Sequence, residues 1–164
     1  MTATEITKQL DKEVKTFFSL VQPEIKREHP YGDLTYAGLL SDKMLIIEII
    51  RRGVPYSLFN LIQHSAPFSE HDWANILDIS TKSLQRYKQT SRNFKSIQSE
   101  KIIEMAEVTH AGLDVFGDLE RFELWLKTVN FALGGNKPFD LLRDSYGKDM
   151  VLDELTRINY GILA

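Results

Sequence analysis

"SEHDWANILDISTKSLQRYKQ", residues 69–89, predicts two short helices joined by a tight turn. Ser69, with an aspartate three residues further on, forms a capping-box pattern that marks the start of the first helix. Ala74 supplies the small side chain that two steeply crossing helices need at their contact. Asp78 lies where the turn requires a positive φ, which aspartate tolerates less readily than glycine. Ser80 is expected to cap the second helix.

The charge of this stretch favours a helix-turn-helix that binds DNA. Residues 79–95 carry no acidic side chain and five basic ones, which are Lys82, Arg86, Lys88, Arg92 and Lys95. A basic stripe on a second helix is suited to phosphate contacts, and short polar side chains near the helix start can read base edges. The predicted DNA-binding residues are Ser80, Thr81, Lys82, Ser83, Gln85, Arg86, Lys88 and Arg92. The alternative is a helical hairpin with a solvated basic face, which is what most runs of charge represent.

The composition of the 164 residues is that of an ordinary soluble globular protein, with 43% hydrophobic and 26% charged side chains. The absence of cysteine excludes disulfides and thiolate metal sites. The net charge of −3 means that any binding to nucleic acid must come from a local patch. The N-terminus has no apolar segment of signal-peptide type, and the longest apolar run is too short to span a bilayer. We therefore expect a cytoplasmic protein.

The remainder of the chain predicts an all-α protein, because apolar side chains recur at helical spacing and no segment alternates with period two. In residues 5–21 the apolar positions fall on one face. Residues 22–36 contain two prolines and a glycine and are typical of a connector. The next helix is expected to begin with Ser41 as its N-cap and to end before Gly53, and another to start near Pro55. We predict an N-terminal helical segment (1–52), a helix-turn-helix domain (53–110) and a small C-terminal helical module (111–164).

The stretch "NFALGGNKPFDLL", residues 130–142, could be a phosphate-binding loop, a plain turn or a surface for a partner protein. A Walker-type loop follows a strand and has a hydroxyl after its lysine, and neither feature is present here. A glycine pair that reverses the chain and a proline that starts a helix explain the local geometry. The apolar side chains around the turn indicate either a local core or a partner surface; they are Trp125, Phe131, Leu133, Phe139, Leu141 and Leu142.

Nothing in the sequence favours an enzyme. None of the four histidines has the spacing of a metal-ligand pair, and a lone histidine on a helix is more often structural. No nucleophile elbow and no nucleotide-binding fingerprint is present. We therefore expect no catalytic residue, no metal site and no cofactor.

The chain from about residue 45 to its end resembles Xre-type antitoxins of RES–Xre toxin–antitoxin pairs, the Xre/MbcA/ParS group. The resemblance lies in "RRGVPYSLFNLI", the helix-turn-helix, "FGDLERFELWLKTVNFALGGNKPFDLL" and "LTRINYGILA", which occur in the family's order. Its most specific part is a C-terminal pattern of Trp-Leu, Asn-x-x-Leu-Gly-Gly, x-x-Pro and an apolar pair, followed by Gly147 and by residues 158–161. The family often has a glycine in place of Asp78 and more arginine on its second helix, so these departures bear on DNA affinity.

The resemblance implies two activities. The helix-turn-helix would bind operator DNA and repress the protein's own operon, and the C-terminal module would cover the active-site cleft of a RES-domain toxin that consumes NAD⁺. The toxin-binding positions that it implies are Trp125, Asn130, Leu133, Gly134, Gly135, Lys137, Pro138, Leu141, Arg157, Tyr160, Gly161 and Ala164. Trp125 and Arg157 are the candidate anchors, because aromatic and arginine side chains tend to dominate interface energy. The alternative for Trp125 is that it belongs to the core.

Two further questions stay open at the level of sequence. The apolar residues at the end of the first helix, which are Phe17, Phe18, Leu20 and Val21, favour self-association through residues 1–50, with packing on the chain's own core as the alternative. We expect a homodimer, because such proteins commonly read two half-sites. The rival functions are a free-standing transcription regulator with a C-terminal small-molecule sensor, and an inhibitor whose helix-turn-helix no longer binds DNA.

Overall fold

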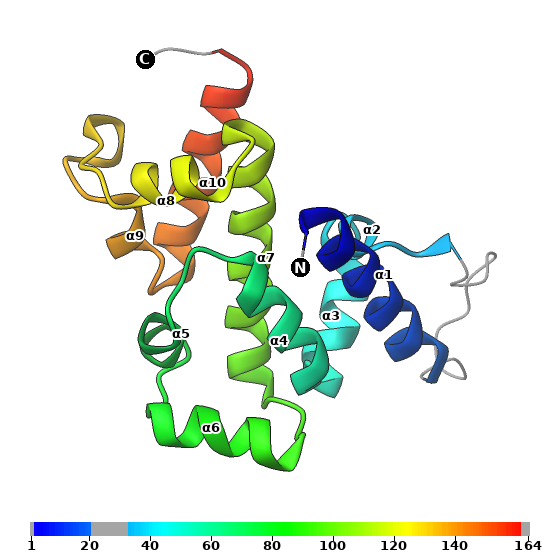
Figure 1. Ribbon diagram of the computed structural model, residues 1–164. Helices are drawn as coiled ribbons and strands as arrows, with labels where there is room; N and C mark the ends of the chain where they lie inside the picture. Colours follow the sequence, from blue (N-terminus) through cyan, green and yellow to red (C-terminus); the bar gives the residue numbers. More distant parts are fainter. Residues whose placement is uncertain (1, 21–32, 162–164) are drawn as a thin grey trace.

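The computed structural model describes residues 2–20 and 33–161, and in these residues the protein is built from helices and connecting turns (Figure 1). The helices are α1 (Ala3–Leu20), α2 (Tyr36–Leu40), α3 (Lys43–Arg52), α4 (Tyr56–Ser65), α5 (Glu70–Ile76), α6 (Thr81–Thr90), α7 (Ser96–Phe116), α8 (Leu119–Leu126), the short 3-10 helix η2 (Phe131–Leu133), α9 (Pro138–Leu141) and α10 (Ser145–Asn159). The predicted all-α class is confirmed. Most of the predicted connector over 22–36 lies outside the described residues. None of the described helices combines the length and hydropathy needed to cross a bilayer.

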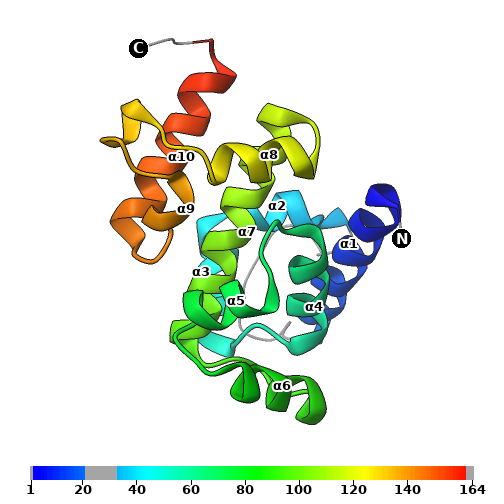
Figure 2. The ribbon, with the colours of Figure 1, turned by 60° about the vertical axis from the view of Figure 1, so that its left-hand side comes forward.

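Helix α7 runs through the middle of the molecule, and both halves of the chain pack against it (Figures 1 and 2). Helices α2, α3 and α4 pack against it from the N-terminal half, and α8 and α10 from the C-terminal half. The helix is therefore buried on most of its circumference, at Ser99, Ile102, Ile103, Glu104, Met105, Ala106, Val108, Thr109 and Gly112. A left-handed Gly117 ends it.

The local signals for α5 and α6 are confirmed. Ser69 and Asp72 form a reciprocal capping box at the start of α5, and Ser80 caps α6 by accepting from the N–H of Ser83 at 3.0 Å. Asp78 has the expected positive φ, 52°. The expected N-cap at Ser41 is wrong by one residue, because the Asp42 carboxylate accepts the N–H groups of the first turn of α3.

Aromatic rings hold the helix-turn-helix region together. The Phe59 ring lies 5.2 Å from that of Trp73 and 4.8 Å from that of Phe94, and Tyr87 of α6 stacks on Phe94 at 4.2 Å. Phe68 continues the cluster by contacting Trp73. The tilt of α6 is thus fixed by ring packing on α4 and on the start of α7.

Helix α1 packs on α4 and α2 of the same chain. Its side chains Leu10, Val14 and Phe18 are buried, and the Asp11 carboxylate accepts the N–H of Tyr36 at 2.7 Å. Packing on the chain's own core therefore accounts for most of the apolar face of α1, although Leu20 remains 81% exposed. Val21 lies outside the described residues. Self-association through residues 1–52 stays a prediction.

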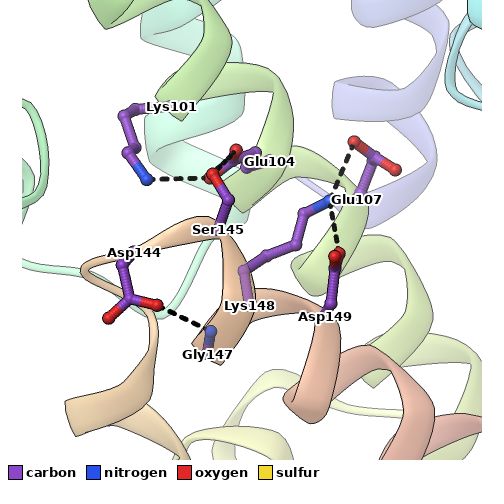
Figure 3. A network of polar contacts seen from close by, with 8 residues as sticks. All are labelled: Lys101, Glu104, Glu107, Asp144, Ser145, Gly147, Lys148 and Asp149. Atoms are coloured by element: carbon purple, nitrogen blue, oxygen red, sulfur yellow. Dashed lines mark hydrogen bonds and ion pairs between the residues drawn. The ribbon is translucent and has the colours of Figure 1, made fainter.

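A close backbone approach and a cap fix the start of α10. A Cβ atom at position 147 would lie 1.9 Å from the carbonyl oxygen of Leu141, so only glycine allows α9 to lie this close to α10. The Asp144 carboxylate accepts the N–H of Gly147 at 2.8 Å and caps α10 (Figure 3). The glycine of the family pattern at this position therefore has a steric reason.

Polar groups on α7 also hold the start of α10 (Figure 3). Glu104 of α7 is only 6% exposed. Its carboxylate accepts a 2.8 Å hydrogen bond from the Ser145 hydroxyl and forms an ion pair with Lys101 at 3.1 Å. Glu107 lies about one turn further along α7, and its carboxylate is 3.8 Å from the Nζ atom of Lys148 of α10. Burial raises the pKa of Glu107, and the Lys148 ammonium opposes that rise.

We predict that Lys148→Met destabilises the protein by about 1 kcal/mol at pH 7. This lies between the typical loss for an exposed ion pair and that for a buried one. Without the ammonium, the pKa of Glu107 rises further, so the charged carboxylate disfavours the folded state more strongly above that pKa. The loss should shrink as the pH falls towards 4, where Glu107 is mostly protonated in both states. Urea unfolding at both pH values measures this.

Lys8→Met on the exposed side of α1 is the control and should change the stability little at either pH. An equal loss for Lys148→Met at pH 7 and pH 4 would mean that packing of the lysine stem, not its charge, stabilises the start of α10.

Candidate functional site

The outward face of α6 carries the basic side chains that the sequence singled out. Lys82, Gln85 and Arg86 are exposed and lie opposite the buried Leu84. Gln89, which the sequence analysis did not select, completes this face at the helical spacing of three, four and seven residues. The helical spacing from Lys82 could have selected Gln89 from the sequence. This face can meet a row of phosphates and, between them, the polar edges of bases.

The other predicted DNA-binding residues are placed differently. The Ser80 hydroxyl donates to that of Ser83 at 3.0 Å and accepts the N–H of Ser83, so both serines serve the cap of α6. Thr81 is exposed at the start of the helix. Lys88 borders a polar groove between α4 and α6, and Arg92 is exposed just after the helix ends.

An acidic neighbour on α5 also touches this face. The Gln85 side-chain amide donates to the Glu70 carboxylate at 3.3 Å. This pair orients Gln85, and it brings one negative charge close to an otherwise basic helix. Glu70 could not be selected from the sequence, because the crossing angle of α5 and α6 that brings it to Gln85 follows from the tertiary packing.

The glycine turn between α8 and α9 is closed by its own hydrogen bonds. Asn130 donates its N–H to the Asn136 carbonyl at 2.9 Å, and its own carbonyl accepts the N–H of Gly135 at 3.0 Å. The Asn130 carboxamide accepts the N–H of Ala132 at 2.8 Å. Gly134 and Gly135 have φ values of 68° and 76°, which the reversal requires.

The hydrogen bonds that close the glycine turn argue against a phosphate-binding loop. Every backbone N–H from 132 to 136 donates within the turn, to Asn130, Phe131 or Leu133. A phosphate cradle needs such groups to point at the ligand. The turn is therefore a rigid, internally satisfied structure, which agrees with the turn interpretation. Among the described residues, no group of three or more histidine and carboxylate side chains could hold a metal ion.

The predicted toxin-binding positions divide into an exposed and an interior set. The exposed residues are Gly134, Gly135, Lys137, Tyr160 and Gly161. Leu133 and Pro138 are buried, and Asn130, Leu141, Trp125 and Arg157 are partly buried. Ala164 lies outside the described residues.

The two candidate anchors are both partly engaged within the chain. Trp125 packs with its ring centroid 5.6 Å from that of Phe116 and 6.3 Å from that of Phe122, yet keeps part of its surface exposed. The Arg157 guanidinium lies 3.5 Å from the Glu154 carboxylate. Both residues therefore have a structural partner within the chain, and their role as anchors stays a prediction.

The C-terminal module exposes large apolar side chains that the predicted site omits. They are Leu124, Val129, Phe131, Tyr146 and Met150, and Phe131 is 94% exposed. Phe122 and Leu126 of α8 point inwards, and the helical period places Leu124 on the opposite face. The sequence alone could therefore have indicated that Leu124 is exposed. The sequence marked Phe131 only as one of several apolar side chains around the glycine turn, and because a turn has no period it could not show which of them point outwards.

The two candidate surfaces lie at opposite ends of α7. Helix α6 leads into the start of α7 at the lower end of the molecule, and η2 and the end of α10 lie at the upper end in both views (Figures 1 and 2). A helix of 21 residues is about 30 Å long, so a macromolecule bound at one end leaves the other accessible.

The described part of the chain also contains an apolar cavity of about 620 Å³ between α1, α2, α4 and α7. The Thr109 hydroxyl, which lines this region, is buried without a hydrogen-bond partner. The cavity touches the C-terminal module only at its edge, near Gly117 and Leu119.

Comparison with known proteins connects these surfaces with a family. The model of the antitoxin Xre-like helix-turn-helix domain matches residues 45–107. The model of the antitoxin Xre/MbcA/ParS C-terminal toxin-binding domain matches residues 111–161. The first match contains α5 and α6, and the second contains the glycine turn and α10.

Individual proteins agree with these matches. An antitoxin Xre from Photorhabdus laumondii is 26% identical over 71% of this chain and 79% of its own length, and one from Yersinia enterocolitica is 25% identical over 73% and 82%. A chain in the crystal structure of the M. tuberculosis MbcT–MbcA toxin–antitoxin complex has a similar fold, with a TM-score of 0.50 and 24% identity over 59% of this chain and 86% of that chain. With two family models matching residues 45–107 and 111–161, this chain belongs to the Xre/MbcA/ParS family of antitoxins.

Proposed function

We propose that the protein neutralises a RES-domain, NAD⁺-consuming toxin by covering its active-site cleft with residues 111–164, and that it represses its own operon through α6. The observation that carries this proposal is the placement of the toxin-binding match and of the basic helix at opposite ends of α7. One chain can then hold a toxin and an operator together. Such a protein acts by binding, needs no catalytic group, and would work in the cytoplasm as a homodimer.

The surface of the C-terminal module supports binding to a protein. Large apolar side chains are exposed on α8, η2 and α10, whereas the buried side chains Phe122, Val151 and Leu155 form the module's own core. Several large apolar side chains exposed on one small module are what a protein–protein interface would cover. The domain division we propose keeps residues 53–110 for DNA and 111–164 for the toxin, with α7 shared by both.

The charge distribution supports binding to DNA despite the net charge of −3. Residues 79–95 carry five basic side chains and no acidic one, and these outnumber the one carboxylate, Glu70, that contacts Gln85 of α6. Lys82 and Arg86 are one helical turn apart on the outward face, a spacing that suits contacts to successive phosphates.

The alternative is a free-standing transcription regulator with a C-terminal sensor for a small molecule. The apolar cavity beside Thr109 is the observation that favours a ligand site at all. It is lined mainly by helices that precede the C-terminal module, so the sensor of that alternative would have to lie between α1 and α7.

We predict that replacing Lys82 and Arg86 together by alanine weakens binding to the DNA upstream of the protein's own gene. Two lost phosphate contacts should also reduce the slope of log K against log salt by about two units, because each contact releases about one counterion. Fluorescence anisotropy at several salt concentrations measures both quantities.

Replacing Lys8 and Lys12 by alanine is the matched control, since these exposed lysines of α1 carry the same total charge. That variant should keep the affinity and the slope. If the wild-type chain did not bind this DNA at any salt concentration, the protein would be an inhibitor without repressor activity.

We predict that Gly135→Trp abolishes neutralisation of the RES-domain protein encoded in the same operon. A Cβ atom at position 135 meets nothing within 4 Å, so the new side chain would project outwards and keep the two surfaces apart. Growth of cells that express both proteins, and co-elution of the purified proteins, measure the effect.

Gly117→Trp is the matched control, because Gly117 also has a positive φ, 78°, and open space beyond its Cα. It carries the same backbone strain without altering the turn. Protection of the cells by Gly135→Trp as complete as that by Gly117→Trp would remove the glycine turn from the proposed interface.

A further inference from the structure

We propose that Phe131 is the anchor of the toxin-binding surface, and that its ring enters an apolar pocket beside the cleft of the toxin. This inference rests on the proposed function, because it names the side chain through which the same surface binds. Phe131 is the most exposed of the large apolar side chains in the described part of the protein, at 94%.

Within the described part of the chain, the ring of Phe131 is not packed into the core. Among the described aromatic rings, those of Phe116, Phe122 and Trp125 pack together in this module, and the ring of Phe131 is not part of that cluster. The side chain of the nearby Leu133 is only 3% exposed and attaches η2 to the module. The 3-10 helix also packs against α10. The 3-10 helix thus directs one apolar side chain inwards and leaves another in solvent.

The turn holds the backbone that carries this exposed ring in one conformation. The Asn130 carboxamide caps η2, and the left-handed Gly134 closes it by donating its N–H to the Phe131 carbonyl at 3.1 Å. A second link joins the two ends of the turn at Asn130 and Asn136. Because the backbone is ordered before any partner binds, the entropy lost on binding is small, and preorganised aromatic side chains of this kind tend to dominate interfaces.

The chemistry of the occupant follows from the side chain. A phenyl ring offers neither a hydrogen-bond donor nor a charge, so the pocket that receives it must be apolar and desolvated on contact. The toxin-binding domain model that matches residues 111–161 makes a protein surface the occupant that we infer. Trp125 is a weaker candidate for this role because its ring is already packed against Phe116 and Phe122.

The test measures the affinity of the full chain for the co-encoded RES-domain protein by isothermal titration calorimetry. Phe131→Ala should raise Kd by at least about 30-fold, the size typical of an interface hot spot, and Phe131→Leu should raise it less. Ile97→Ala removes another exposed apolar side chain, 72% exposed, at the opposite end of α7, and should change Kd less than about twofold. Thermal melting should be unchanged in all three variants, and operator binding should be unchanged in the two Phe131 variants.

A second measurement does not depend on losing affinity. The chain has no cysteine, so Ala132→Cys introduces a single thiol at an exposed position beside Phe131. This thiol should react rapidly with a maleimide in the free protein and be protected in the complex. An unprotected thiol in a saturated complex would overturn the inference.

The two levels of the proposal fail in different ways. If the wild-type chain does not bind the RES-domain protein at all, the proposed function fails. If the wild-type chain binds and Phe131→Ala binds equally well, the function stands and the role of Phe131 is overturned.

Discussion

Burial of α7 on most of its circumference is the constraint on which the rest of the structure depends. A helix with a single apolar stripe packs against one layer, whereas α7 buries apolar side chains towards α3 and α4 and also towards α10. Neither the helix-turn-helix nor the C-terminal module can cover it alone. The two modules are therefore held on one rigid axis, and the surfaces that they present lie at its two ends.

The polar groups on α7 make this arrangement specific. Apolar burial alone would allow α10 to slide or rotate along α7, because dispersion and hydrophobic contacts have little direction. Glu104 bonded to Ser145 and Glu107 facing Lys148 fix the register at the start of α10. The raised pKa of Glu107 shows that this register has a desolvation cost, which the nearby ammonium partly offsets.

The glycine turn illustrates how a motif can specify a scaffold rather than a contact. Asn130, Leu133, Gly134 and Gly135 close the turn, cap it and attach it to the module. The side chain that the turn leaves in solvent, Phe131, lies between the motif's fixed residues. Substitution of a motif residue therefore changes the shape of the turn, whereas substitution of Phe131 changes only what the turn offers to a partner.

The helical class, the caps at Ser69 and Ser80 and the positive φ of Asp78 could be predicted from the residues alone, because each depends on residues close together in the chain. The resemblance to the family also predicted that the helix-turn-helix precedes the C-terminal module. Only the tertiary structure decided which side chains of the glycine region are exposed, because exposure depends on packing against α7 and α10. It also placed Glu70 beside Gln85 and separated the two candidate surfaces. A turn has no hydrophobic period, so its outward side chains become visible only once the elements around it are in place.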